Sequence, residues 1–362
     1  MKGSGRTTYR SRPLLHGSAV AAVAAVALAL AACTSAPPSP QRTQASPSAP
    51  LPSTGPQPVD RWGWYDDVLS GTRLYVDPAS RAARALRAGT TLRGSQRASL
   101  SYLSRWPVAT WIGEDVAVAA VARRVRVLVT AAAARRQIPV LVIYAIPHRD
   151  CGGPSGGGQP SARAYRAWVD QVAAGLGQHR AVVVLEPDSL AQEGCLAPAL
   201  RTQRLGLLRH AVTALARDRA ALVYLDGGNS RWQPVAAMAA RIAQVGVTRV
   251  RGFAIDVAGF GALDGEIAYG RDISARLGRV PFVVDTSRDG RWPATGATSW
   301  CNPRGRGLGR TPTTSPGTPP VDALLWVKTP GVSDGTCRPG EPRAGTYWAA
   351  YADGLVRRRA TD

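Results

Sequence analysis

Histidine and several familiar catalytic motifs are scarce in this chain of 362 residues. Its four histidines, at positions 16, 148, 179 and 210, belong to no HExxH or paired Cys/His spacing, so metal hydrolysis and Ser-His catalysis have little support. The chain also lacks a P-loop and the glycine pattern of dinucleotide-binding folds. We therefore predict no metal and no cofactor. Chemistry that needs only carboxylates remains.

Lysine is nearly absent, because only Lys2 and Lys328 occur in a chain whose formal net charge is +21. Lys328 is either a chance remnant or a position that needs a compact ammonium instead of a planar guanidinium. A basic surface can bind nucleic acid, anionic lipid or anionic wall polymers. The arginines are scattered and no nucleic-acid motif accompanies them, so we predict no nucleic-acid partner. We expect a solvated basic surface held against an anionic envelope.

Residues 1–60 have the features of a targeting segment. A basic start is followed by an aliphatic, small-residue stretch at 18–32, which ends in Leu30-Ala-Ala-Cys33, the pattern of a bacterial lipobox. We predict a signal peptide at 1–32, a lipidated Cys33 that anchors the exported protein at the cell surface, and a disordered tether at 33–60, which is rich in Pro, Ser, Thr and Gln. An ordinary secretory signal cut near Ala32 is the alternative.

Residues 61–362 alternate apolar runs with Ala/Arg-rich helical stretches. The predicted strands are 74–76, 109–112, 140–146, 182–186, 222–226, 252–257, 281–285 and 323–327. The predicted helices are 116–136, 161–177, 199–217, 234–245 and 267–277. This order implies a mostly parallel sheet with crossover helices. Eight strands without a dinucleotide-binding pattern favour an α/β barrel of the TIM-barrel type.

One of these strands ends in two carboxylates. The apolar run 182–185 stops at Pro187, which cannot extend a ladder, and Glu186 and Asp188 flank the proline. In α/β folds the carboxyl ends of strands carry catalytic groups. A helix N-cap or a structural salt bridge is the alternative explanation for the same two residues.

Other predicted strands also end in acidic residues. These are Asp150, Asp226, Asp285 and Asp334. Carboxylates that converge on one rim form an acidic cleft in which burial and like charge raise one carboxyl pKa. Trp232 and Trp300 lie in turn-rich sequence beside these ends, where an indole can stack on a sugar face.

Nine motifs, in order across residues 73 to 358, resemble glycoside hydrolase family six, the cellobiohydrolases and endoglucanases acting on β-1,4-glucan. They are Tyr75-Val-Asp-Pro78, Ala109-Thr-Trp111, Tyr144-Ala-Ile-Pro-His-Arg-Asp-Cys151, Tyr165-Arg-Ala-Trp168, Leu185-Glu-Pro-Asp188, Tyr224-Leu-Asp-Gly-Gly-Asn-Ser-Arg-Trp232, Asp285-Thr-Ser-Arg288, Trp300-Cys-Asn302 and Leu325-Trp-Val-Lys-Thr-Pro-Gly-Val-Ser-Asp-Gly335. The resemblance implies a distorted (β/α) barrel, a catalytic domain at 61–362, a β-glucan substrate and inversion of the anomeric centre. We expect a monomer.

The resemblance also implies catalytic roles. Asp188 is the general acid, and Asp150 raises its pKa and helps to organise the catalytic water. Asp334 matches the residue usually proposed as the base, an assignment that is disputed in the family. Tyr144 presses on the distorted sugar, and Ser155 is the nearest match to a serine that positions water.

Substrate-binding roles follow in the same way. Arg149 and Lys328 match residues that bind sugar hydroxyls, and Asp226 matches a further carboxylate of the cleft. Trp232 and Trp300 match stacking platforms on either side of the cleavage point.

Four substrate-contact positions depart from the family pattern. Ala145 and Asp256 replace asparagines, Asn229 replaces a histidine, and Val332 replaces a substrate-binding glutamate. A catalytically weak glycan-binding lipoprotein, or a surface protein that binds anionic wall polymer, is therefore the alternative function. Endo and exo action both remain open.

Four cysteines remain once Cys33 is set aside, an even number in an exported chain. The sequence alone allows three pairings. The resemblance implies Cys151–Cys195 and Cys301–Cys337.

Overall fold

The computed structural model describes residues 68–89, 91–217, 220–291 and 300–360. The predicted signal peptide at 1–32, Cys33 and the tether at 33–60 lie outside the described residues. No described helix has the length and apolar character needed to cross a bilayer.

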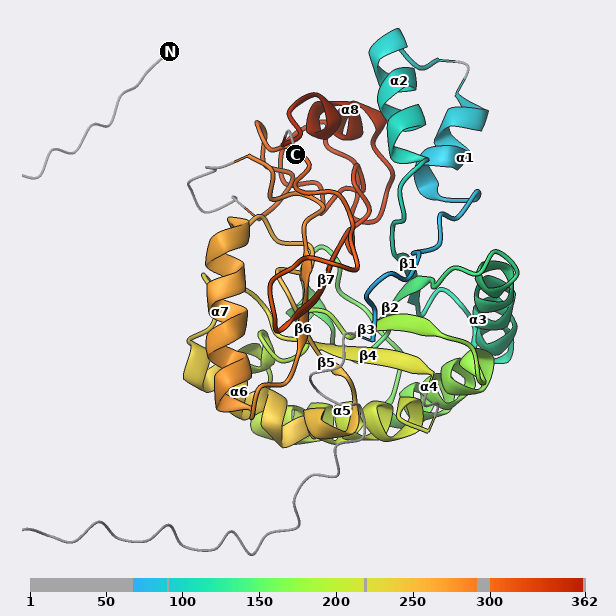
Figure 1. Cartoon of the computed structure of the whole chain (residues 1–362). Coiled ribbons are helices and arrows are strands. Elements are labelled where there is room, and N and C mark those ends of the chain that lie inside the picture. The colour runs from blue at the N-terminus through green and yellow to red at the C-terminus, as the bar shows by residue number, and fades with distance from the viewer. Residues whose placement is uncertain (1–67, 90, 218–219, 292–299, 361–362) are drawn as a thin grey trace, which may run out of the picture. The chain divides into compact units, whose positions relative to one another are not determined.

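Seven parallel strands form one curled sheet in the order of the chain, β1 to β7 (Figure 1). Their bounds are Thr110–Gly113 (β1), Val140–Tyr144 (β2), Ala181–Leu185 (β3), Ala221–Asp226 (β4), Gly252–Ile255 (β5), Phe282–Asp285 (β6) and Val321–Leu325 (β7). Because every neighbouring pair is parallel, all carboxyl ends meet at one rim. The predicted distorted barrel class is confirmed.

The barrel is incomplete between β1 and β7, which share no ladder. Near this seam the Ala109 amide donates to the Trp326 carbonyl at 3.0 Å, and Trp111 Nε1 donates to the Val327 carbonyl at 2.8 Å. The predicted strand at 74–76 is wrong, because it forms only an isolated bridge between Leu74 and Ile138. Pro139 follows Ile138 and has no amide hydrogen with which to extend the ladder.

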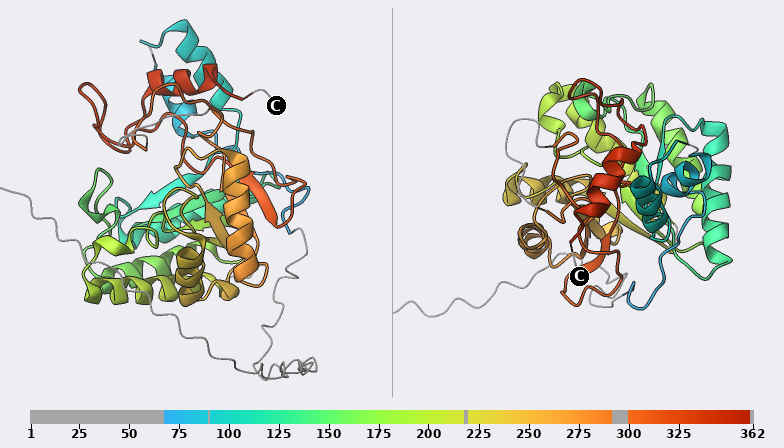
Figure 2. Two further views of the ribbon diagram at one scale, coloured as in Figure 1. Left: turned by 90° about the vertical axis from the view of Figure 1, so that its left-hand side faces the viewer. Right: turned by 90° about the horizontal axis from the view of Figure 1, so that it is seen from above.

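Five crossover helices cover the outer face of the sheet and match the five predicted helices (Figures 1 and 2). They are Val118–Ala133 (α3), Ala162–Leu176 (α4), Pro198–Leu215 (α5), Val235–Val245 (α6) and Leu263–Arg276 (α7). Strand side chains alternate between two cores. Ile143 and Leu185 pack against the helices, whereas Val142 and Val184 pack inside the barrel.

Three short helices were not predicted: Arg81–Ala88 (α1), Gly94–Leu103 (α2) and Ala349–Arg357 (α8). They form a third core with Trp326, to which α2 contributes Leu100 and α8 contributes Leu355. Helices α2 and α8 pack against each other (Figure 2). A local signal for α1 exists, since the Ser80 hydroxyl caps its first turn. Helices α2 and α8 are far apart in sequence but pack against each other. The sequence of either short segment by itself does not predict this contact.

Candidate active site

The end of β3 turns sharply through two residues with left-handed backbone. Glu186 has φ 49° and Asp188 has φ 69°, on either side of Pro187. The Glu186 carboxylate is buried and accepts the Ala145 and Ile146 amides at about 3.0 Å, which ties the end of β3 to the end of β2. Glu186 therefore has a structural role, but through the backbone amides of another strand end and not as the helix N-cap or salt-bridge partner of the alternative explanation.

Asp188 lies in surroundings that keep its carboxyl protonated. Burial and the neighbouring Asp150 raise its pKa to about 7, although Lys328 and a hydrogen bond with Tyr144 act in the opposite direction. The Asp188 amide donates to Asp226 Oδ2 at 3.0 Å. Burial and the charge of Asp188 raise the pKa of Asp226 well above its ordinary value. A large fraction of Asp188 thus carries a proton near pH 7.

Asp150 is held beside Asp188 by hydrogen bonds to both of its carboxylate oxygens. Gln192 Nε2 donates to Oδ1 at 3.0 Å, and the Ser155 backbone amide donates to Oδ2 at 2.8 Å. Ser155 therefore contacts Asp150 through its main chain. The role predicted for its hydroxyl, positioning water, stays a prediction.

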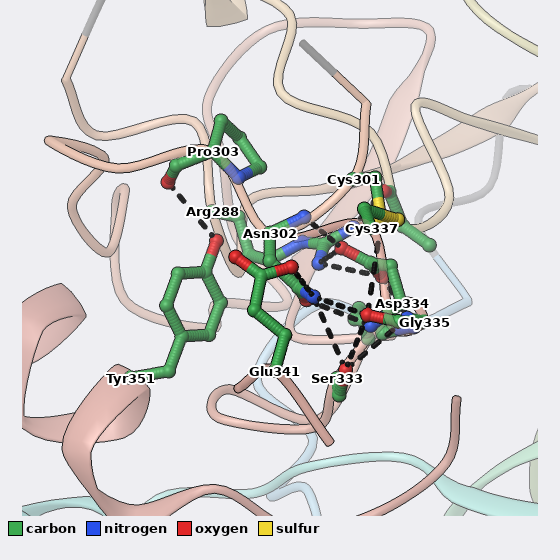
Figure 3. A network of polar contacts seen from close by, with 12 residues as sticks. Arg288, Cys301, Asn302, Pro303, Ser333, Asp334, Gly335, Cys337, Glu341 and Tyr351 are labelled. Atoms are coloured by element: carbon green, nitrogen blue, oxygen red, sulfur yellow. Dashed lines mark hydrogen bonds and ion pairs between the residues drawn. A yellow bond between two sulfur atoms is a disulfide. The ribbon is translucent and has the colours of Figure 1, made fainter. Parts of the chain in front are cut away.

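Asp334 has the opposite electrostatics. Arg288 Nη1 contacts both of its oxygens at 2.7 and 2.9 Å, and the Asn302 amide donates to Oδ2 at 3.0 Å (Figure 3). Lys328 Nζ contacts Oδ1 at 2.8 Å. Burial raises its pKa, but Arg288 and Lys328 outweigh burial, and the net pKa is lowered. Asp334 is a fixed anion at neutral pH.

Arg149 and Tyr144 form one wall of a cleft. The Arg149 guanidinium pairs with Glu114, donates to the Tyr144 carbonyl at 2.8 Å, and lies 4.3 Å from the centroid of the Tyr144 ring. Its Nε donates to the Ser155 carbonyl at 2.8 Å. Acceptors within the protein thus use much of the hydrogen-bonding capacity of the Arg149 guanidinium. The guanidinium also packs against the Tyr144 ring and holds it in position. Direct binding of substrate by Arg149 stays a prediction.

A cavity of about 550 Å³ opens along this wall. Its lining includes Trp111, Tyr144, Ser155, Lys328 and Val332. The Trp111 and Tyr144 rings meet edge to face with centroids 5.2 Å apart. A cavity of this size with aromatic walls and a few polar groups is typical of a small-ligand site.

Trp232 and Trp300 lie outside this cavity and are exposed. Their relative exposures are 38% and 52%, values that are high for indoles and leave ring faces available to a ligand. The predicted stacking role therefore has accessible rings. The stacking role of Trp232 and Trp300 stays a prediction.

The departures from the family pattern occupy different environments. Ala145 is buried beneath the Glu186 hydrogen bond, and Val332 lines the cavity. Burial, Glu266 and Asp289 raise the pKa of Asp256 well above its ordinary value. Burial thus favours the uncharged form of Asp256, at a position where the family pattern has an uncharged amide.

Both predicted disulfides are present. Cys151–Cys195 and Cys301–Cys337 have Cα separations of 6.2 and 6.4 Å. Cys301, Cys337 and Glu341 form a group of metal-type side chains in the described part of the chain, but disulfide sulfurs are not the thiolates that metals bind.

Four residues that build the site were not among the predicted site residues: Glu114, Gln192, Arg288 and Asn302. Arg288 and Asn302 lie inside two of the family motifs quoted above, so the sequence could have indicated them as site residues. Glu114 and Gln192 meet their partners only through folding, across 35 and 42 residues of sequence.

These features define a parallel α/β barrel with aspartates gathered at the carboxyl ends of its strands. Residues 69–359 match the model of the glycosyl hydrolases family 6, and the chain belongs to this family.

Named relatives agree with this assignment. Endoglucanase A of Cellulomonas fimi is 40% identical over 78% of this chain and 61% of its own length. Endoglucanase 1 of Streptomyces halstedii is 39% identical over 76% of this chain and 85% of its own length. The chain thus spans about three fifths of the Cellulomonas relative.

A solved structure shares the fold. It is the endoglucanase Cel6 from Mycobacterium tuberculosis in complex with methyl-cellobiosyl-4-deoxy-4-thio-β-D-cellobioside. The sequences are 44% identical, the TM-score is 0.78, and the match covers 81% of this chain and 99% of the other.

Proposed function

We propose that this protein is an inverting β-1,4-glucanase in which Asp188 is the general acid. The observation that carries the proposal is the position of Asp188, which is half-buried at the end of β3 and donates its amide to Asp226. These surroundings raise the pKa of its carboxyl to about 7, so it can donate a proton at neutral pH. An unperturbed aspartic acid is ionised at that pH and has no proton to give.

In the proposed reaction Asp188 protonates the glycosidic oxygen of the leaving sugar while water attacks the anomeric carbon from the opposite face. Room for this water requires acid and base carboxyls roughly 6.5–9.5 Å apart. Arg288 and Lys328 lower the pKa of Asp334, so this carboxylate is a weak base. We propose that Asp334 orders the attacking water and receives its proton through a chain of waters.

The substrate-binding residues are assigned by their places around the cleft. Trp111 and Tyr144 form an aromatic wall beside Lys328, which contacts sugar hydroxyls. Trp232 and Trp300 supply stacking platforms, and Arg149 and Asp226 complete the predicted binding set. The relatives named endoglucanases support cleavage within a β-glucan chain, so we propose endo action.

We propose that the enzyme works outside the cell as a monomer tethered through Cys33. The lipobox and the Pro/Ser/Thr-rich segment support this location.

The test is the anomeric configuration of the sugar released from barley β-glucan, followed by NMR during the first minutes of reaction. We expect the α-anomer first. Asp188→Ala should lower kcat by several orders of magnitude on β-glucan and much less on substrates with activated leaving groups, which need no protonation. Asp170→Ala, at a carboxylate paired with His210 outside the cleft, is the matched control and should leave kcat unchanged.

Initial release of the β-anomer, or wild-type turnover by Asp188→Ala, would refute the proposal. Salt-sensitive binding to wall polymer without any hydrolysis would instead support the alternative of an anionic-wall-binding lipoprotein.

A further inference from the structure

Asn302 lies beside Asp334 in a buried polar network (Figure 3). It follows Cys301, its relative exposure is 1%, and its backbone is left-handed with φ 42°. An asparagine tolerates this conformation better than most residues. The conformation lets both the main chain and the side chain of Asn302 reach Asp334.

The two contacts with Asp334 are reciprocal. The Asn302 amide donates to Asp334 Oδ2 at 3.0 Å, and the Asp334 amide donates to Asn302 Oδ1 at 2.8 Å. The first contact fixes the carboxylate and the second fixes the main chain that carries it. The loops that follow β6 and β7 are joined at this point, next to the Cys301–Cys337 disulfide.

The orientation of the Asn302 amide is set by its other partners. Nδ2 donates to Ser333 Oγ at 3.1 Å, to the Gly335 carbonyl at 2.8 Å and to Glu341 Oε2 at 3.1 Å. A carbonyl and a carboxylate can only accept, so the flipped amide would face two acceptors with its oxygen. Oδ1 must therefore point toward the Asp334 amide.

Glu341 completes this arrangement as an anion. Burial raises its pKa, but hydrogen bonds from Asn302 and Arg338 lower it overall. Arg338 Nη1 contacts Glu341 Oε1 at 2.9 Å and also reaches the Asn302 carbonyl at 3.3 Å. A charged acceptor strengthens the hydrogen bond that holds the Asn302 amide.

We propose that Asn302, oriented by Glu341, is a positioning residue that holds Asp334 in place for the attack of water. The proposal rests on the function proposed above for Asp334. Asn302 is 1% exposed and its side chain is hydrogen-bonded to protein groups, so it acts through Asp334 and not on the sugar. A displacement of about 1 Å in a reacting group can cost about 100-fold in rate.

Asn302→Gly tests the side chain alone. Glycine keeps the amide that donates to Asp334 Oδ2 and adopts φ 42° without strain, but it removes Oδ1 and Nδ2. We expect kcat on barley β-glucan to fall about 10-fold or more while KM changes by less than about 3-fold, because no substrate contact is lost.

A reciprocal exchange tests the role of Glu341. Asn302→Asp places an oxygen against the Gly335 carbonyl and Glu341, and we expect kcat to fall about 100-fold. Adding Glu341→Gln supplies an amide that can donate to the new carboxylate. The double variant should regain kcat to within about 10-fold of the wild type, a recovery that additive structural damage does not produce.

Asp353→Asn is the matched control for damage to a buried polar group. Asp353 is buried in α8 and accepts the Ser99 hydroxyl at 2.8 Å. This variant should lower Tm and leave kcat unchanged. All variants are assayed at least 20 °C below their own Tm, so that unfolding does not enter kcat.

Folded Asn302→Gly with wild-type kcat would overturn the proposal. A double variant no better than Asn302→Asp would overturn the part assigned to Glu341. If Asn302→Asp does not fold, Asn302→Gly still decides the question. A wild-type protein without β-glucanase activity would refute the proposed function and this inference with it, whereas an active wild type with equally active variants refutes only the inference.

Discussion

At the scale of the residue, two neighbouring aspartates differ in pKa because of the groups around them. Burial and Asp150 raise the pKa of Asp188, whereas Arg288 and Lys328 lower the pKa of Asp334. Lys328 contacts Asp334 directly and also lowers the pKa of Asp188, so it acts on both carboxyls. Two groups of one type driven to opposite protonation states are a usual basis for acid catalysis at neutral pH.

The pKa of Asp188 predicts the alkaline side of the activity profile. With a value of about 7, the acid loses its proton above neutral pH, and kcat on β-glucan should fall toward 10-fold per pH unit. Substrates with activated leaving groups should show a weaker decline. Measuring kcat from pH 5 to pH 9 on both substrates checks this. An alkaline limb centred near pH 4 would contradict the assignment.

The same pKa predicts a pH-dependent effect on stability. The pKa of Asp188 in the folded state lies above the unfolded value of about 4. The free energy of unfolding therefore decreases as pH rises from about 4 to about 7. Asp188→Asn removes the ionisable group. The Tm of this variant should therefore exceed that of the wild type at pH 8, and the difference should shrink at pH 4. Equal differences at both pH values would argue against a raised pKa.

At the scale of the element, the residues proposed as catalytic lie on loops that are joined to one another at the strand ends. The loops after β2 and β3 are joined by Cys151–Cys195 and by Arg204, whose guanidinium donates to the His148 and Ser189 carbonyls at 2.6 and 3.2 Å. These ties hold Asp150 beside Asp188. A rigid parallel sheet beneath such loops supplies the precision that a cleft needs.

The disulfides should contribute stability of similar size. They span 44 and 36 residues of sequence, and chain entropy gives about 3–4 kcal/mol for loops of this length. Cys151→Ala/Cys195→Ala and Cys301→Ala/Cys337→Ala should each lower the free energy of unfolding by about that amount in guanidinium titrations. The first pair should also lower kcat, because it loosens Asp150 relative to Asp188. A loss below about 1 kcal/mol in both would contradict the entropic account.

At the scale of the whole molecule, the sequence predicts an anchored enzyme with a basic surface. Residues 1–32 carry four of the 21 net positive charges, at Lys2, Arg6, Arg10 and Arg12, so most of the charge stays on the anchored part. This charge favours contact with anionic lipid and wall polymer, and the low-hydrophobicity segment 33–60 supplies reach. The predicted anchor keeps the cleft near the cell instead of on a distant fibre.

Removing the lipidation site tests this location. Cys33→Ser should move the protein from the membrane fraction to the soluble fraction, because two acyl chains give stable anchoring that a signal-cleaved chain lacks. The kcat of the released enzyme on soluble β-glucan should be unchanged. Fractionation after a wash at high salt separates lipid anchoring from electrostatic adhesion. An unchanged membrane fraction for Cys33→Ser would rule out the anchor.

The sequence by itself determined the parallel barrel, seven of its strands and the carboxylates at the rim, because these depend on local patterns. Apolar runs such as 182–185 specify buried strands, and parallel strands bring Asp150, Asp188 and Asp226 to one edge. The resemblance supplied the pairing of the cysteines, which spacing alone left open among three choices.

Only the tertiary structure decided which carboxyl is protonated and what holds each one in place. The pKa values of Asp188 and Asp334 depend on burial and on charges from other strand ends. Gln192 and Asn302 meet their carboxylate partners across 42 and 32 residues of sequence. Electrostatic interactions and hydrogen bonds act over a few ångströms in space, and no local pattern in a chain records that distance.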